Sequence, residues 1–129
     1  MLDIPAPVVA SGALANGASW TLRIGGTRAE CHAQFHLRHL QGGFAEIAGP
    51  IPTGDQLTST TCGSTLGRRL FFALGGLEVA VVQLSLVAGP PLELAPLHTA
   101  DDLGVRAFFT LLDGPQTLLH ATGLRHPTD

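Results

Sequence analysis

Lysine and tyrosine are absent from this 129-residue sequence, and charged residues make up only 13% of it, against about 25% in an average soluble protein. The seven basic residues are all arginines, and ten acidic residues give a net charge of −3. A protein that binds nucleic acid without sequence preference needs a stripe of basic side chains that displaces counterions from the phosphates. The only adjacent basic pair is Arg68-Arg69, so we do not expect nucleic acid as a partner.

Long hydrophobic runs are also missing. A membrane-spanning helix needs about 18 or more apolar residues, and the best stretch, 77–88, is broken by Glu78, Gln83 and Ser85. The first five residues carry no basic residue and begin no long apolar run, so no signal peptide is expected. We therefore predict that this segment does not insert into a membrane.

Glycine and proline, by contrast, are abundant, with 16 and 9 residues. Many lie in pairs that are typical of turns, namely Gly25-Gly26, Gly42-Gly43, Gly49-Pro50, Gly54-Asp55, Gly75-Gly76, Gly89-Pro90-Pro91 and Asp113-Gly114-Pro115. Short apolar runs separate these turns. The pattern predicts one all-β domain over 1–129, an antiparallel sandwich or closed barrel of about 8–10 short strands. Within it, 1–17 could form an extended N-terminal arm.

Apolar patterning indicates where the strands lie. In 18–24, Trp20, Leu22 and Ile24 alternate with polar residues, as in a strand with one buried face. The segment 57–62 is rich in β-branched residues, and 92–97 is expected to be extended. Two prolines restrict 4–10 to an edge strand or an arm. The segment 98–104 could hold one helical turn, with Thr99 as its N-cap.

Two hairpins are expected from the turn chemistry. The apolar runs 70–74 and 77–87 flank Gly75-Gly76, and two glycines between such runs are typical of a two-residue hairpin. Within the second run the apolar phase slips by one residue, which predicts a bulge at Val81-Val82. The runs 105–112 and 116–124 form the second hairpin candidate, around Asp113-Gly114-Pro115.

The segment 27–42 fits two structures. As a helix over 28–41 it has a capping box, Thr27 with Glu30, and a glycine at its end, which would make the fold α+β. As a strand, it alternates without a break over nine residues and places Cys31 and Phe35 on one face. We favour the strand, because the helix leaves Phe35 on the side away from the other apolar residues.

Three histidines in this segment, His32, His36 and His39, suggest a metal site. On a helix they would share one face. On a strand, residues four apart are about 13 Å apart, whereas each ligand must lie about 2 Å from a shared zinc ion. The favoured strand therefore predicts no metal site.

Cys31 and Cys62 are the only cysteines. Their even number and strand-like contexts favour a disulfide between them, which the chain-entropy model values at about 3.7 kcal/mol. The alternative is two buried thiols in a cytosolic protein. A bridge would favour an extracytoplasmic location, since reducing compartments oppose disulfides.

No catalytic constellation or cofactor motif is recognised. Ser64 is not centred in a Gly-x-Ser-x-Gly elbow, and the glycine pairs match neither a P-loop nor a dinucleotide fingerprint. The carboxylates are scattered, without spacing that commits two of them to one site. We therefore expect no catalytic residue and no cofactor.

The order of features has a weak family resemblance. Trp20-Thr-Leu is followed by Cys31, a glycine-rich stretch, Cys62, the run from Arg68 through Gly75-Gly76 to Leu84, and a final strand at 118–123. This order resembles uncharacterised small extracytoplasmic β domains of high-GC Gram-positive bacteria, often tethered to the membrane. The resemblance covers about 18–124 and implies a sandwich with a Cys31–Cys62 bridge. It implies no catalytic residues.

Three functions are compatible with these features. The leading hypothesis is a non-catalytic β-sandwich module for protein interaction or homo-oligomeric assembly, because the strands around Val82, Leu84 and Phe108 carry apolar residues on both faces and an exposed apolar face usually marks an interface. The second is a small barrel that binds or transforms a hydrophobic small molecule. The third is a structural subunit of a capsid, tail or surface filament. The candidate ligand or partner contacts are His32, His36, Arg38, Val82, Leu84 and Phe108.

Overall fold

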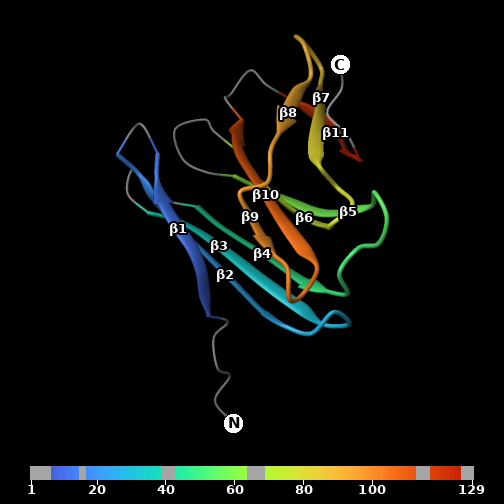
Figure 1. The fold of residues 1–129 in the computed structure, drawn as a ribbon. Coiled ribbons are helices and arrows are strands. Elements are labelled where there is room, and N and C mark those ends of the chain that lie inside the picture. The colour runs from blue at the N-terminus through green and yellow to red at the C-terminus, as the bar shows by residue number, and fades with distance from the viewer. Residues whose placement is uncertain (1–6, 15–16, 39–42, 64–68, 113–116, 126–129) are drawn as a thin grey trace.

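The computed structural model describes residues 7–14, 17–38, 43–63, 69–112 and 117–125, and in these residues the chain is all-β, without a helix (Figure 1). The described strands are β1 Val8–Ala13, β2 Ser19–Gly26, β3 Cys31–Arg38, β4 Gly43–Gly49, β5 Leu57–Gly63, β6 Arg69–Gly76, β7 Val81–Leu86, β8 Leu92–Leu94, β9 His98–Ala100, β10 Val105–Leu112 and β11 Leu118–Leu124. The predicted fold class is confirmed.

The strands form three antiparallel sheets. The first sheet has the order β1-β2-β3-β4, the middle sheet β5-β6-β10-β9, and the third sheet β11-β7-β8. Figure 1 shows the first and third sheets on different sides of the middle one. None of the three closes into a barrel in the described part of the chain, so the sandwich is confirmed and the closed barrel is wrong.

The segment 27–42 contains a strand, β3. Cys31, Ala33 and Phe35 are buried, whereas the side chains between them are partly exposed. This period of two is the pattern of a strand with one face on a core. The alternative helix at 28–41 is therefore wrong, and β3 pairs with β2 on one side and β4 on the other.

The middle sheet separates two apolar cores, and β6 contributes to both. Leu70, Phe72 and Leu74 point into the core shared with the first sheet. Phe71 and Ala73 point into the core shared with the third sheet. Because successive side chains of a strand point to opposite faces, the unbroken apolar run 70–74 is the sequence of a strand that is covered on both sides.

Gly75-Gly76 does not form the predicted hairpin. β6 continues through both glycines and pairs with β10 and β5, whereas β7 belongs to the third sheet. A Cβ at Gly75 would lie 3.0 Å from Val79 Cγ2. Because Gly75 has no side chain, the segment that contains Val79 can pack closely against β6, and the glycine pair does not form a two-residue turn.

The second predicted hairpin is also wrong. β10 pairs with β6 and β9, whereas β11 pairs with β7. The turn residues 113–116 lie outside the described residues. The register irregularity in the β7–β11 pair falls between Leu118 and His120 on β11, and not at Val81-Val82 as predicted.

Three smaller expectations have mixed outcomes. Residues 57–62 lie within strand β5, as predicted. β1 is the edge strand of its sheet, as the prolines required, although 4–6 lie outside the described residues. Thr99 caps no helix, because His98–Ala100 is strand β9 against β10.

Candidate functional site

The outward-facing side chains of β2, β3 and β4 form a surface that we call the outer face. It carries Thr21, Arg23, His32, Gln34, His36, Arg38, Phe44, Glu46 and Ala48, which alternate with the buried residues of the same strands. Three residues singled out in the sequence, His32, His36 and Arg38, therefore lie together here. The sequence pattern did not identify Phe44 and Glu46 as candidate contact residues.

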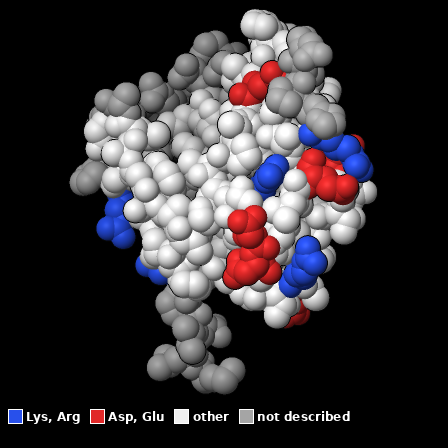
Figure 2. Space-filling model, viewed as in Figure 1, with Lys and Arg blue, Asp and Glu red and all other residues white. Residues whose placement is uncertain are grey.

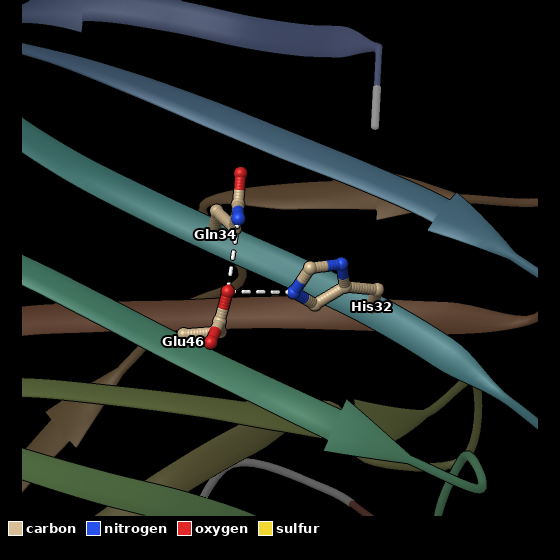
Figure 3. A network of polar contacts seen from close by, with 3 residues as sticks. All are labelled: His32, Gln34 and Glu46. Atoms are coloured by element: carbon tan, nitrogen blue, oxygen red, sulfur yellow. Dashed lines mark hydrogen bonds and ion pairs between the residues drawn. The ribbon is translucent and has the colours of Figure 1, made fainter. Parts of the chain in front are cut away.

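A polar cluster on β3 and β4 orders one part of the outer face (Figure 3). Glu46 Oε2 lies 2.7 Å from His32 Nε2 and accepts a 2.9 Å hydrogen bond from Gln34 Nε2. The hydrogen bonds from Gln34 and His32 hold the pKa of the Glu46 carboxyl below its usual range. Glu46 is therefore a carboxylate at neutral pH, and it fixes the positions of two neighbouring side chains.

An aromatic pair lies beside this cluster. The rings of His36 and Phe44 have centroids 4.5 Å apart, as expected for residues that are directly opposite in the β3–β4 register. The Phe44 side chain is nevertheless 44% exposed. Arg38, at the end of β3, is exposed as well. The outer face thus offers an aromatic ring between cationic and anionic side chains.

Val82, Leu84 and Phe108 lie elsewhere and are fully buried. They belong to the core between the middle and third sheets. The prediction that they contact a partner or ligand is therefore wrong: the second apolar face of these strands is covered by another sheet of the same chain.

Cys31 and Cys62 are free thiols, so the predicted disulfide is wrong. Cys31 pairs with Gly49 at the end of β4. Cys62 pairs with Leu70, whose side chain packs against Gly43 at the start of β4. A strand of that length separates its two ends by about 20 Å, whereas bridged Cα atoms lie about 4.4–6.8 Å apart. The extracytoplasmic location lacks the support that a bridge would give.

The space between the first and middle sheets is filled by aromatic rings. Phe35 stacks on Phe72 and Phe109, with centroids 5.6 and 4.3 Å away. The predicted apolar lumen of a ligand-binding barrel therefore has no counterpart there. A cleft of about 560 Å³ lies instead among the loops, where Arg28, Thr53 and Glu78 contribute its polar side chains. None of the predicted contact residues lines it.

Three further observations concern metal sites, membrane-spanning helices and surface charge. In the described ranges, no group of three or more His, Cys, Asp or Glu side chains is placed to hold a metal ion, and His39 lies outside these ranges. No helix of the described chain is long and apolar enough to cross a membrane. In the view of Figure 2, most of the charged side chains lie on the right, where positive and negative ones are neighbours, and the left half of the described surface is mostly uncharged.

No protein-family model matches the chain, and neither a curated protein nor a solved structure is significantly similar to it. The resemblance to small extracytoplasmic β domains stays a prediction.

Proposed function

We propose that this chain is a non-catalytic β-sandwich module that binds a protein partner through its outer face. The observation that carries the proposal is Phe44, an aromatic side chain that is 44% exposed on a sheet face. Aromatic and arginine side chains are enriched at the centres of protein interfaces. Phe44 has Arg38 and Glu46 nearby on the same face, which are suited to orienting a partner by charge.

The geometry of the outer face supports protein binding over catalysis. Its side chains come from neighbouring strands of an open sheet, and none of them lines the loop cleft. The carboxylate of Glu46 is engaged with His32 and Gln34 on the surface. A catalytic site usually needs a concave, water-excluding pocket, whereas a protein interface needs an exposed patch with a few ordered anchors.

Site-specific photocrosslinking tests the proposal. A benzophenone amino acid at position 44, in cells of the organism that makes the protein, should give a discrete crosslinked protein that mass spectrometry identifies. The matched control places the same group at Thr58, an exposed position on β5, and should not give that product. With the identified partner purified, Phe44→Ala should weaken binding by about tenfold or more. No product at position 44, or unchanged binding, would contradict the proposal.

A further inference from the structure

Resting on that proposed function, we infer that the partner is a second copy of this chain, docked outer face to outer face about a two-fold axis over His36 and Phe44. The charge pattern of the face carries this inference. An interface with two-fold symmetry must be self-complementary, because each patch meets its own image.

The strand register defines the pattern. His36 is opposite Phe44, and Gln34 is opposite Glu46, in the β3–β4 pair. Arg38 follows His36 by two residues on the same face of β3. One such step along a strand is about 7 Å. Arg38 and Glu46 therefore lie on opposite sides of the His36–Phe44 pair, at similar distances from it and on adjacent strands.

A two-fold axis exchanges these two charges. An axis that lies in the interface plane, passes midway between His36 and Phe44 and is tilted by about 20° from the perpendicular to the strands carries the position of Arg38 onto that of Glu46. Each copy then sets its Arg38 against the Glu46 of the other copy, and two ion pairs flank the central rings. On a flat projection of the register, the same axis places Arg23 over Ser11 and Thr21 of the other copy, where no like charge opposes it.

Charge reversal distinguishes this arrangement from any other dimer. The unaltered chain should dimerise in sedimentation velocity and native mass spectrometry at millimolar concentration. Arg38→Glu sets a glutamate against the native Glu46, and Glu46→Arg sets an arginine against the native Arg38. Each change should weaken the dimer by about tenfold or more, because like charges opposed in an interface are costly.

Complementation gives the sharper readout. When the two single variants are mixed, the glutamate introduced at position 38 of one copy meets the arginine introduced at position 46 of the other. The second ion pair of this heterodimer joins the native Arg38 and Glu46, so both pairs are present and one of them is reversed. We expect a heterodimer of unaltered strength from the mixture, and a restored homodimer from the double variant R38E/E46R. The matched controls Arg69→Glu and Asp101→Arg change equivalent charges at exposed positions of the middle sheet and its adjoining turn, and should leave the dimer intact.

The outcomes separate the two proposals. A monomer at every concentration, or a dimer that charge reversal and mixing leave unchanged, overturns the second copy as partner. If position 44 then crosslinks a different protein, the proposed function stands without this inference. If position 44 crosslinks nothing, both fail. Circular dichroism of each variant verifies folding, and recovery in the mixture excludes misfolding as the cause of a weakened dimer.

Discussion

At the scale of single residues, burial separates the two cysteines. Cys31 is 1% exposed, and burial raises the pKa of its thiol, whereas Cys62 is partly exposed. Since the thiolate is the reacting form, iodoacetamide should label Cys62 about tenfold or more faster than Cys31 in the native protein. Peptide mass spectrometry over a labelling time course measures both rates.

The same experiment in denaturant examines the pairing of the cysteines. Without reductant, both thiols should then become labelled, as expected for free cysteines. Two cysteines that resist labelling until a reductant is added would show a disulfide and contradict the structure. Equal native rates would contradict the difference in burial.

The β3 part of the outer face could be predicted at the residue scale. Alternation within 31–38 placed His32, His36 and Arg38 on one face, because a strand has a period of two. Phe44 and Glu46 were missed, since they join the site through cross-strand register. The signal that could have found them is the alternation of Phe44, Glu46 and Ala48 with Ala45 and Ile47, read as the second strand of a hairpin.

At the scale of elements, β11 depends on a glycine. A Cβ at Gly123 would clash with the backbone carbonyl oxygen of Asp55, in the segment before β5. Backbone cannot move aside as a flexible side chain can, so Gly123→Ala should lower the free energy of unfolding by about 1–3 kcal/mol. Urea unfolding followed by circular dichroism measures the change.

A neighbouring position supplies the control for that change. Thr122→Ala alters an exposed side chain on the same strand and should stay within about 0.5 kcal/mol of the unaltered chain. If Gly123→Ala leaves the free energy of unfolding unchanged or raises it, the close approach of Gly123 to the Asp55 backbone is contradicted. Where the backbone conformation and the space permit a side chain, replacing glycine by alanine stabilises a protein.

Strand positions were easier to predict than strand partners. The runs at 70–74 and 105–112 are strands, but neither pairs with the strand that follows it after its turn signal. Glycine pairs are compatible with a hairpin turn and with close packing alike. At Gly75 the close approach of Val79 decides between them, and that contact depends on the third sheet, which local sequence does not reveal.

At the scale of the whole molecule, the low charge content and the strands with apolar residues on both faces reflect one arrangement, a middle sheet that is covered on both faces. A chain with apolar residues on both faces of a sheet must cover the second face with another sheet, a ligand or another subunit. The third sheet provides that cover, with Val82 and Leu84 packed over Phe71 and Phe108. The middle sheet is consequently common to both cores, and this arrangement predicts that they unfold together.

Phe108→Ala tests this coupling, because it removes a ring from the core that Trp20 does not contact. Trp20 is the sole tryptophan and packs against the other core. The substitution should lower the free energy of unfolding by about 3–5 kcal/mol. The core shared with the first sheet should be destabilised as well, because Val105 and Ala107 of the same strand, β10, are buried in it. Trp20 fluorescence and far-UV circular dichroism should therefore show the same lowered urea midpoint.

Leu119→Ala, at a side chain that is 62% exposed on β11, is the control and should leave both midpoints in place. If Phe108→Ala does not accumulate, Phe108→Leu makes the same comparison with a smaller shift. A Trp20 midpoint that stays unmoved while circular dichroism falls in two steps would show that the cores unfold independently. Coincident midpoints would follow from a middle sheet whose strands cannot lose one core without losing the other.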